Sequence, residues 1–419
     1  MFFYNLLLIV ALIIASPYLL VRFAVDKKWR SGWRQRLGLE IPRPAKPSLW
    51  LHAASVGEVK IAAALSRALV KKYPDYTVVL SVVTLTGLNQ ARQELAGMVE
   101  VVLAPLDLPW IVDKFIRSLR PRLIGLVETE LWPNLITRAA AQKVKMAVLN
   151  GRLSDRSYPR YKNFKGLFKQ ILPRLDLVCA QTETDAKRFR ELGADPAAVR
   201  VCSSIKYDLV LTGKYDMAAM RREFSLPASA PVWTCGSTRN GEEEILLPVY
   251  AELKREFSDL KLILAPRHLE RVAEISRLLE KNNILYMLKS KLGAEPKPYD
   301  CLLLDTMGEL VKAYAAGTVV FVGGSLVNYG GQNILEPAML GKPMAFGPSM
   351  NNFQEIAGQL IADDAARQVK DSGELLKQLH SWLLRPEEAQ AIGDRSSQSA
   401  GKKRGAIDKN IGALEGLLS

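Results

Sequence analysis

From Pro47 onward the chain alternates short apolar runs with longer amphipathic ones, and no other feature constrains its fold as strongly. The first strand-like runs are SLWLHAA, TVVLSVV, VEVVLAP, RLIGLVE, KMAVLN, DLVCAQ and VRVCSS. Helix-like segments such as LTGLNQARQELAG and PWIVDKFIRSLR separate them. Strands that alternate with helices in this way predict a parallel sheet wrapped by helices.

A second series with the same alternation begins at Pro231, with the strand-like runs PVWTCGS, KLILAPR, DCLLLD, TVVFVGG and PMAFG. The polar, turn-rich stretch SSIKYDLVLTGKYDMAAMRREFSLPASA separates the two series, and 419 residues suffice for two cores. We therefore predict two tandem doubly wound, Rossmann-like α/β domains at residues 47–212 and 213–419. Ligands of such domains bind outside the carboxyl ends of the strands, so the active site is expected in a cleft between two facing sheets.

The N-terminus has a different character, because residues 1–21 carry no charge. At about 1.5 Å per helical residue this stretch matches the roughly 30 Å core of a bilayer. We predict a transmembrane anchor at residues 1–24 and a basic segment at 25–46, with Trp29 and Trp33 among cations on an anionic membrane surface. A merely solvated basic linker is the alternative for that segment. A cleaved signal peptide fits poorly, since its basic residues would precede the apolar run.

The net charge of +14 and the pI near 9.5 suggest an anionic partner. Nucleic acid is not expected, because the chain has neither zinc-finger spacing nor an aromatic RNA-binding consensus. The four cysteines lie apart, in or beside apolar strand-like runs, and are predicted to be buried thiols rather than disulfides or zinc ligands: Cys179, Cys202, Cys235 and Cys301. This usage fits a reducing compartment.

Several short motifs stand at the ends of predicted strands: ASVGE (54–58), VETELWP (127–133), SIKYD (204–208), CGSTRNGEEE (235–244), APRH (265–268), GGSLVNYGGQNILEP (323–337) and FGPSMNNF (346–353). None is a Walker A or G-x-G-x-x-G sequence, which argues against an NTPase or a dehydrogenase. A D-x-D triplet commonly holds a diphosphate group through a divalent metal ion. No such triplet occurs in this chain, so we expect a metal-independent reaction. Glu58 falls in the first turn of the helix after the first strand, where it could cap that helix or act as a base at the mouth of a cleft.

The glycine-rich stretch VGGSLVNYGGQNILEPAMLG predicts a strand, a loop and a helix that starts near Asn333. Amides at such a helix start bind phosphate oxygens, and Glu336, one turn in, could hold ribose hydroxyls. A glycine-rich turn with a capping acid is the alternative. Arg267, at the end of the strand KLILAP, could neutralise the same phosphate.

Together these motifs resemble the 3-deoxy-D-manno-octulosonate (Kdo) transferase family of lipopolysaccharide synthesis. The resemblance rests on ASVGE, ELWP, IKYD, GST, PRH, GGQNILEP, GKP and FGP in this order, and on the N-terminal anchor and the basic segment W-R-x-R-x-G after it. It implies a GT-B fold and an inverting transfer of Kdo from CMP-Kdo to a lipid A precursor, without a cofactor. The enzyme is expected at the bacterial inner membrane with both catalytic domains in the cytoplasm.

The resemblance also implies roles for individual residues. Glu58 matches the general base, and Glu130 and Lys206 match positions that stabilise the transition state. The CMP moiety would be held by Pro266, Arg267, Met307, Gly308, Glu309, Asn333, Ile334, Leu335 and Glu336. An acid suits the positive charge that develops at the anomeric carbon, and cations suit the departing phosphate. Glu130 as a surface cap and Lys206 as a linker charge remain alternatives, and Met307 is expected to be partly in the core.

The chain also departs from the family pattern. The family often has His where this chain has Gln332, Arg239 and Ser349, and Asn where it has Ser204. These departures concern the contacts to the sugar donor. Two rival functions stay open: another GT-B transferase that uses a UDP- or ADP-sugar, and a membrane-tethered protein that binds lipid or nucleotide without catalysis.

Overall fold

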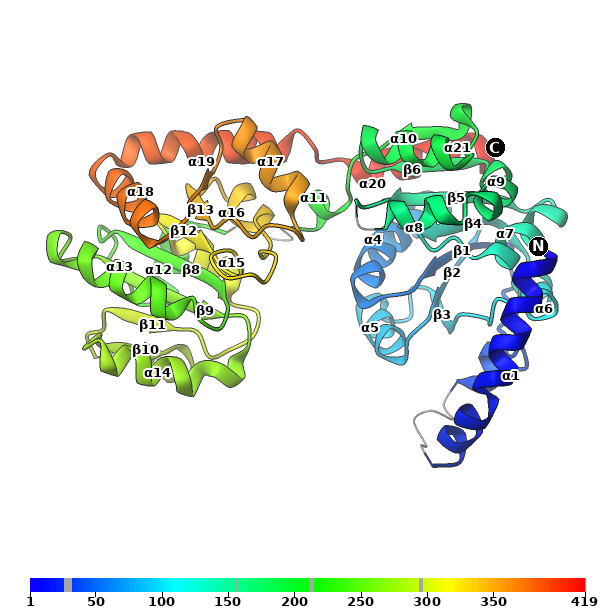
Figure 1. Ribbon diagram of the computed structural model, residues 1–419, viewed down its shortest axis with the longest axis horizontal. Coiled ribbons are helices and arrows are strands. Elements are labelled where there is room, and N and C mark those ends of the chain that lie inside the picture. The colour runs from blue at the N-terminus through cyan, green and yellow to red at the C-terminus, as the bar shows by residue number, and fades with distance from the viewer. Residues whose placement is uncertain (26–31, 156, 211–214, 294–296, 419) are drawn as a thin grey trace. The chain divides into compact units, whose positions relative to one another are not determined.

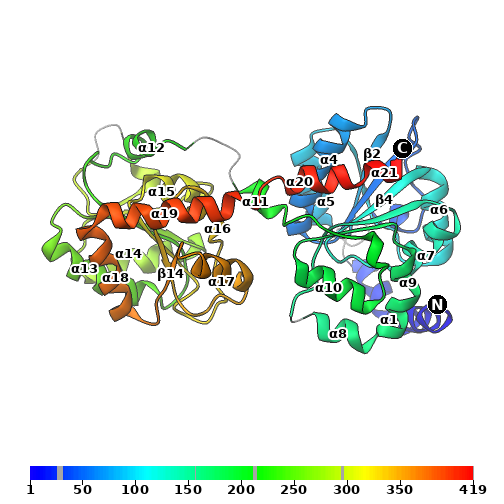
Figure 2. The ribbon, with the colours of Figure 1, turned by 90° about the horizontal axis from the view of Figure 1, so that it is seen from above.

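The structure of the chain is a computed structural model that describes residues 1–25, 32–155, 157–210, 215–293 and 297–418. It divides into two compact units. Unit 1 comprises Met1–Leu209 together with Arg404–Ser419, and unit 2 comprises Val210–Lys403. Each unit contains one parallel sheet with helices packed on it (Figures 1 and 2). The predicted pair of Rossmann-like α/β domains is confirmed.

The sheet of unit 1 has the strand order β3-β2-β1-β4-β5-β6-β7, and all its pairings are parallel. Its strands are β1 (Ser48–Ala53), β2 (Thr77–Val82), β3 (Glu100–Leu103), β4 (Pro121–Val127), β5 (Lys145–Gly151), β6 (Leu177–Ala180) and β7 (Val199–Val201). The chain runs outward from β1 in one direction and from β4 in the other. The topological switch point, where such sheets bind ligands, therefore lies between the carboxyl ends of β1 and β4.

Helices cover both faces of this sheet, and alternate side chains of β1 point into two apolar cores. Trp50 packs with α6, α7, α9 and α10, whereas Leu49 and Leu51 pack with α4, α5 and α20. The helices of unit 1 are α1 (Phe2–Val25), α3 (Trp33–Arg36), α4 (Val56–Lys72), α5 (Leu85–Leu95), α6 (Pro109–Leu119), α7 (Pro133–Ala141), α8 (Tyr158–Asn163), α9 (Lys165–Ile171), α10 (Glu183–Leu192), α11 (Lys206–Leu209), α20 (Ala406–Ala413) and α21 (Glu415–Leu418).

The sheet of unit 2 has the order β10-β11-β9-β8-β12-β13-β14, again parallel, with its switch point between β8 and β12. Its strands are β8 (Val232–Thr238), β9 (Lys261–Pro266), β10 (Tyr286–Leu288), β11 (Cys301–Leu303), β12 (Val319–Val322), β13 (Met344–Phe346) and β14 (Arg367–Gln368). Its helices are α12 (Met217–Glu223), α13 (Glu243–Glu256), α14 (Val272–Lys281), α15 (Leu310–Ala316), α16 (Leu335–Met339), α17 (Gln354–Ala362), α18 (Ser372–Leu384) and α19 (Pro386–Gly401). All four cysteines are buried and free of disulfides, as predicted.

The end of the chain corrects the predicted C-terminal domain of residues 213–419, because residues 404–419 return to unit 1 (Figure 1). The carboxylate of Asp208 accepts hydrogen bonds from the amides of Gly405 (2.7 Å) and Ile407 (2.8 Å) at the start of α20. The apolar side of α20 fills the core beside α4. Burial of that side explains why the helix packs on unit 1. The predicted boundary between residues 212 and 213 lies outside the described residues.

The N-terminal helix α1 also differs from the prediction of a transmembrane anchor at residues 1–24. Over the part of the chain that the structure describes, no helix is long and apolar enough to cross a membrane. Instead, the start of α1 is bound to unit 1 by polar contacts: the Tyr4 hydroxyl donates to Asp107 (2.9 Å), and Asn134 Nδ2 donates to Asn5 Oδ1 (2.7 Å). The first turn of α1 is thus held against unit 1.

The predicted basic segment at residues 25–46 is described at Val25 and from Gly32 onward. Lys27, Lys28, Trp29 and Arg30 lie outside the described residues. Of the later cations, Arg34 forms an ion pair with Glu40, and Arg36 donates to the carbonyl of Val83. These two arginines are thus engaged by the protein itself.

Candidate active site

Glu58 sits at the switch point of unit 1, in the first turn of α4, directly after β1. Ser55 is the N-cap of this helix and accepts a hydrogen bond from the Glu58 amide (3.3 Å). In return, Glu58 Oε1 accepts from the Ser55 hydroxyl (2.7 Å), and Oε2 accepts from the Ala54 amide (2.7 Å). This is a capping box in which the carboxylate accepts from the amide of Ala54, the residue before the N-cap, instead of from the amide of the N-cap itself. It confirms the interpretation that Glu58 caps the helix. Each carboxylate oxygen keeps a second lone pair, so the side chain can still accept a proton.

Glu128 is a second acid at the same switch point, and it was missed in the sequence. It follows the last residue of β4 in the left-handed conformation (φ 58°), which is uncommon outside glycine and marks a strained position. Burial raises the pKa of Glu128, the charge of Lys206 lowers it, and the charge of Glu58 raises it. The structure therefore brings Glu58, Glu128 and Lys206 into one electrostatic cluster.

Glu130 lies two residues after Glu128, and one of its carboxylate oxygens accepts a hydrogen bond. Its Oε2 accepts a hydrogen bond from the indole Nε1 of Trp132 (2.9 Å), and burial raises its pKa, with smaller contributions from Glu58 and Glu128. The Trp132 ring packs edge-on against His52, with 4.5 Å between ring centres. Glu130 is half-buried and bonded to a side chain rather than to a helix amide, which does not fit a surface cap.

Lys206 is the first residue of α11, and its backbone is held on both sides. The amide of Ile205 donates to Asn150 Oδ1 (2.9 Å), and Asp208 binds the start of α20. Asn150 is in turn held by Asn410 of α20, whose Oδ1 accepts from the Asn150 amide (3.0 Å). Lys206 thus lies on an anchored segment of unit 1, which does not fit a linker charge.

The residues expected to hold CMP all lie in unit 2, after β9, after β11 and at the start of α16. Pro266 ends β9 in a buried position, and Arg267 next to it is exposed. Met307 is 77% exposed, so the expectation that it is partly core is wrong. It stands beside Gly308, whose φ of 86° makes the turn, and Glu309 forms an ion pair with Lys312 (3.3 Å).

The remaining expected donor residues surround the start of α16, which begins at Leu335, close to the predicted start near Asn333. Asn333 Nδ2 donates to Glu336 Oε1 (3.0 Å), and Asn333 Oδ1 accepts from the Leu335 amide (3.1 Å). The side chains of Ile334 and Leu335 are buried in the protein. A ligand could contact these two residues only through their backbone.

The glycine-rich loop after β12 carries a set of amides that point at one internal anion. Glu242 accepts hydrogen bonds from the amides of Gly324 (2.6 Å), Ser325 (2.9 Å) and Leu326 (3.1 Å). It also accepts from the amide of Arg239 (2.9 Å). These loop amides are therefore occupied by a carboxylate of the protein and do not offer a phosphate site.

Comparisons with known proteins show the family of the chain. A family model described as 3-deoxy-D-manno-octulosonic-acid transferase (kdotransferase) matches residues 31–209. The 3-deoxy-D-manno-octulosonic acid transferase of Haemophilus influenzae is 31% identical, over 100% of this chain and 98% of its own length. The chain belongs to the Kdo transferase family. It is therefore a glycosyltransferase.

Solved structures of lower identity agree on the fold of this transferase. The UDP-GlcNAc 2-epimerase of Neisseria meningitidis superposes with a TM-score of 0.62 at 12% identity, covering 88% of this chain and 99% of its own. A glycosyltransferase from Rickettsia africae gives 0.58 at 11% identity, covering 90% and 100%. At these identities the likeness shows the fold alone. The transferase has two parallel-sheet domains of the GT-B type.

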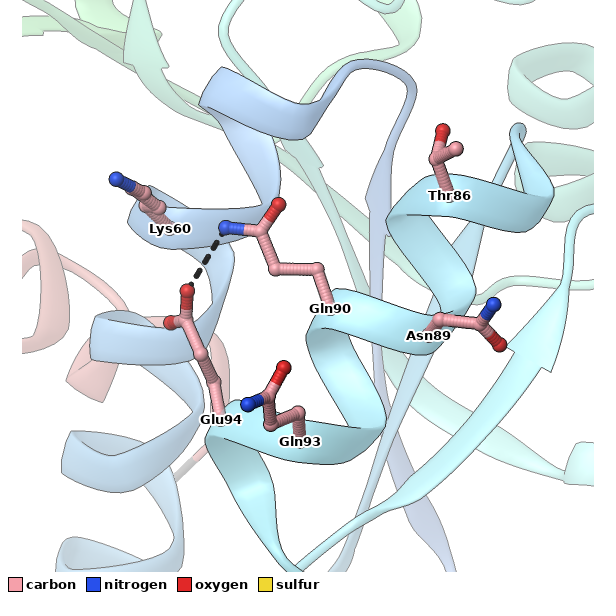
Figure 3. Close-up of a pocket in the computed structure, with 6 residues that line it drawn as sticks. All are labelled: Lys60, Thr86, Asn89, Gln90, Gln93 and Glu94. Atoms are coloured by element: carbon pink, nitrogen blue, oxygen red, sulfur yellow. Dashed lines mark hydrogen bonds between the residues drawn. The ribbon is translucent and has the colours of Figure 1, made fainter. Parts of the chain in front are cut away.

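Unit 1 of the transferase has two further features. An open pocket of about 660 Å³ lies between α4 and α5 and is lined by Lys60, Thr86, Asn89, Gln90, Gln93 and Glu94 (Figure 3). None of these residues was predicted to belong to the site. Within the described ranges, no group of three or more His, Cys, Asp or Glu side chains is arranged to hold a metal ion.

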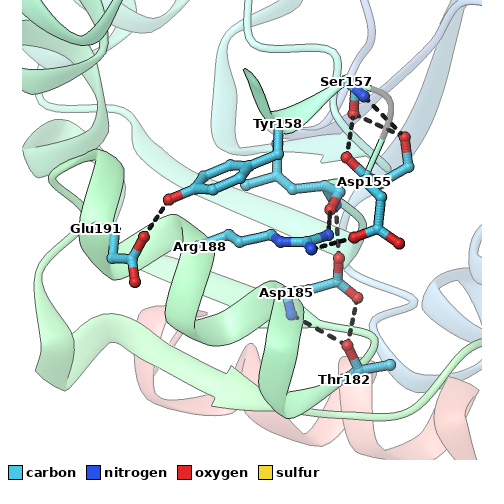
Figure 4. A network of polar contacts seen from close by, with 9 residues as sticks. Asp155, Ser157, Tyr158, Thr182, Asp185, Arg188 and Glu191 are labelled. Carbon is cyan, nitrogen blue, oxygen red and sulfur yellow. Dashed lines mark hydrogen bonds and ion pairs between the residues drawn. The ribbon is translucent and has the colours of Figure 1, made fainter. Parts of the chain in front are cut away.

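The second feature is the cationic, aromatic stretch around α8 and α9, which a polar network ties to α10 (Figure 4). Arg188 of α10 pairs with Asp155 and lies 5.1 Å from the ring centre of Tyr158. Asp185 accepts from the amide of Leu153 (2.7 Å). The network fixes the loop that carries Arg152, whose charge lowers the pKa of Glu128.

Proposed function

We propose that the transferase moves Kdo from CMP-Kdo to a lipid A precursor in lipopolysaccharide biosynthesis, with inversion at the anomeric carbon. One observation carries this proposal: Glu58, Glu128 and Lys206 form one charged cluster at the switch point of unit 1. The acceptor hydroxyl forms the new bond to the anomeric carbon, the bond to the CMP phosphate breaks, and the hydroxyl proton passes to Glu58. CMP leaves with the electron pair.

The roles follow from charge. Glu58 accepts the proton through a lone pair that its capping bonds leave open. Glu128 and Glu130 offer negative charge to the oxocarbenium-like carbon. Lys206 lowers the pKa of Glu128, and its positive charge suits a departing phosphate. Arg267 of unit 2 is a second cation that suits a phosphate. The reaction proposed in this way does not require a metal ion.

The donor nucleotide would be held by unit 2. Pro266, Gly308, Ile334 and Leu335 contribute backbone contacts, and Asn333 and Glu336 present polar side chains that are already oriented by their mutual hydrogen bond. Residues fixed before binding lose little conformational entropy when the ligand arrives. This supports a recognition site for the cytidine monophosphate part of the donor.

The acceptor is a lipid, and two surfaces of unit 1 suit it. Helix α1 exposes a row of large apolar side chains, among them Phe2, Phe3, Leu7, Ile13, Ile14 and Val25. The stretch around α8 and α9 combines the cations Arg160, Lys162, Lys165 and Lys169 with Phe164, which is 64% exposed. We propose that these surfaces contact the anionic lipid acceptor and the cytoplasmic face of the inner membrane.

The decisive experiment supplies purified protein with CMP-Kdo and a lipid A precursor, with and without a chelator, and analyses the lipid by mass spectrometry. We expect a Kdo-bearing product in both cases. If product forms only when metal is added, the metal-independent mechanism is refuted. If the protein turns over a UDP- or ADP-sugar and not CMP-Kdo, the assignment of CMP-Kdo as donor is refuted.

Variants test the base. Glu58→Gln should abolish turnover and leave the affinity for CMP intact, because CMP is assigned to unit 2. Glu100→Gln, an exposed acid at the start of β3, is the matched control and should retain activity. Near-normal turnover of the Glu58 variant would exclude Glu58 as the base.

A further inference from the structure

Trp132 is anchored at its backbone, although the sequence assigned no role to it. It is the N-cap residue of α7, and its side chain makes no capping bond. Asp107, from the loop after β3, caps this helix instead, because its carboxylate accepts from the amides of Asn134 (3.0 Å) and Leu135 (2.8 Å). Pro133, at the first position of the helix, restricts the backbone further. The chain at Trp132 is therefore fixed before any ligand binds.

The side chain of Trp132 is supported by the buried imidazole of His52. The two rings meet edge to face, with 4.5 Å between their centres and 71° between their planes. His52 is fully buried on β1, and its Nδ1 lies 2.9 Å from the hydroxyl of Ser81, its neighbour on β2. The same hydroxyl accepts from the indole Nε1 of Trp50 (2.7 Å). The sheet thus fixes the imidazole, and the imidazole limits the positions that the indole of Trp132 can adopt.

The second nitrogen of His52 makes no hydrogen bond. Nε2 is buried, and it has no hydrogen-bond partner in the described part of the chain. Burial also lowers the pKa of His52 to about 3, so the ring is neutral near neutral pH. An unpartnered buried nitrogen is costly and requires an explanation. Its neighbours supply one: Ser81 can orient an imidazole through Nδ1, and the oriented ring supports Trp132.

The indole of Trp132 in turn holds Glu130. Its Nε1 donates to Glu130 Oε2 (2.9 Å). Burial raises the pKa of Glu130, the hydrogen bond from Trp132 lowers it, and the charges of Glu58 and Glu128 raise it. Tyr161 of α8 also faces this carboxylate, since burial and the charge of Glu130 raise the pKa of Tyr161. The indole thus favours the ionised form of Glu130 against burial and against two neighbouring acids.

We propose that Trp132 is a positioning residue for Glu130, and that His52 is the ring that holds Trp132 in place. Through these two aromatic side chains, β1 sets the direction of a carboxylate that the reaction needs in its ionised form. The inference rests on the proposed function, in which Glu130 faces the positive charge that develops at the anomeric carbon. A carboxylate that is oriented in advance needs no reorganisation when that charge develops.

Trp132→Phe tests the hydrogen bond, because it keeps an aromatic ring on His52 and removes the N–H. We expect the acidic limb of the kcat profile to move to higher pH and kcat near neutral pH to fall by about ten- to a hundredfold, the usual effect of losing a hydrogen bond to a charged group. The affinity for CMP should be unchanged, because CMP is assigned to unit 2. A limb that stays in place would refute the inference even if kcat falls, since a loss of packing alone does not change the pKa of Glu130 in this way.

The matched control is Trp382→Phe in α18 of unit 2. It also removes a buried indole N–H, but this N–H has no hydrogen-bond partner among the described residues. Both kcat and the acidic limb should stay at their wild-type values in this variant. A change equal to that of Trp132→Phe would contradict the inference.

A double-mutant cycle separates positioning from a general loss of packing. If Trp132 acts through Glu130, Trp132→Phe should have little effect on kcat in a protein that already carries Glu130→Gln. A loss of equal size in both backgrounds would contradict the inference.

Two variants of His52 test the support of the indole. His52→Ala removes the ring next to Trp132 and should move the acidic limb in the same direction as Trp132→Phe. His52→Phe restores a ring and should recover part of the loss. If His52→Phe recovers nothing, or if His52→Ala leaves the limb in place, His52 does not hold Trp132. Unchanged affinity for CMP in both variants shows that they are folded.

Nuclear magnetic resonance of the full chain, labelled with ¹⁵N-tryptophan, gives a readout that needs no turnover. The indole signal that Trp132→Phe removes should move with pH in the wild-type protein as Glu130 titrates, and should lose most of this movement in Glu130→Gln. If the signal ignores Glu130, the inference fails whether or not the protein transfers Kdo. If the signal follows Glu130 but no Kdo is transferred from CMP-Kdo, the proposed function fails and the contact between Trp132 and Glu130 stands.

Discussion

His52 makes a sharp prediction about the pH dependence of stability, because its imidazole is fully buried beneath the acidic cluster. The ring has 0% exposure, Nδ1 lies 2.9 Å from the Ser81 hydroxyl, and burial lowers its pKa from 6.5 to about 3. In the unfolded chain the same group titrates at its ordinary value. Protons therefore bind the unfolded state preferentially between these two pH values, and acid destabilises unit 1.

The size of the effect follows from this difference. The contribution of His52 is fully present above pH 6.5 and is lost as the pH falls towards 3. At about 1.4 kcal/mol for each unit of pKa, the total loss is about 5 kcal/mol, with a slope of about 1.4 kcal/mol per pH unit in between. That loss is a large share of the stability of an ordinary domain.

The measurement compares the wild-type protein with His52→Asn by hydrogen exchange of unit 1 peptides in increasing urea, at pH 4, 5, 6 and 7. Comparison at equal pH removes the intrinsic exchange rates and the titration of all other groups. The wild-type protein should lose stability relative to the variant on acidification, whatever constant offset the substitution causes. If the free energies of unfolding of the wild-type protein and the variant change with pH by the same amount, the reasoning is refuted. His380→Asn, on the surface of unit 2, should leave the slope of unit 1 unchanged.

Three further substitutions test the cluster of Glu58, Glu128 and Lys206 and the hydrogen bonds that hold the segment of Lys206. Asn410→Ala leaves the buried Asn150 amide without its acceptor and should lower the free energy of unfolding of unit 1 in urea by about 2–4 kcal/mol. The exposed control Asn89→Ala should lower it by at most about 0.5 kcal/mol. Equal effects of the two substitutions would contradict the assigned hydrogen bond. Glu128→Gln should lower kcat by about 10²- to 10³-fold without weakening CMP binding, and an unchanged kcat would exclude it from the reaction. Lys206→Met should raise the pKa of Glu128, because Lys206 now lowers it, and so move the acidic limb of the kcat profile to higher pH; an unmoved limb would break the link.

Much of this fold was predictable because its central strands are buried on both faces and read as continuous apolar runs. Every strand predicted from such a run is present. The two strands that were missed, β10 and β14, form the edges of the unit 2 sheet, and neither contains a buried residue. An edge strand depends on the backbone of its neighbour rather than on its own apolar pattern.

The site was predictable only where a motif stands alone at a strand end. In VETELWP two acids stand two residues apart, and the sequence cannot tell which faces Lys206. The choice depends on the left-handed turn at Glu128 and on the bond between Glu130 and Trp132, both of which need the packed sheet. The return of α20 to unit 1 was hidden for a similar reason, since its amphipathic pattern would suit either core.

The glycine-rich loop shows how a correct local pattern can mislead about chemistry. The amides of Gly324, Ser325 and Leu326, early in the loop, converge on an anion, but this anion is Glu242 of the same unit. The prediction concerned other amides, those at the helix start near Asn333. This carboxylate already occupies the three amides, which are therefore not available to another anion. At the switch point of unit 1, carboxylates follow both β1 and β4. Under the proposed function, the acids at the switch point of unit 1 take the proton of the acceptor, and unit 2 holds the anionic donor.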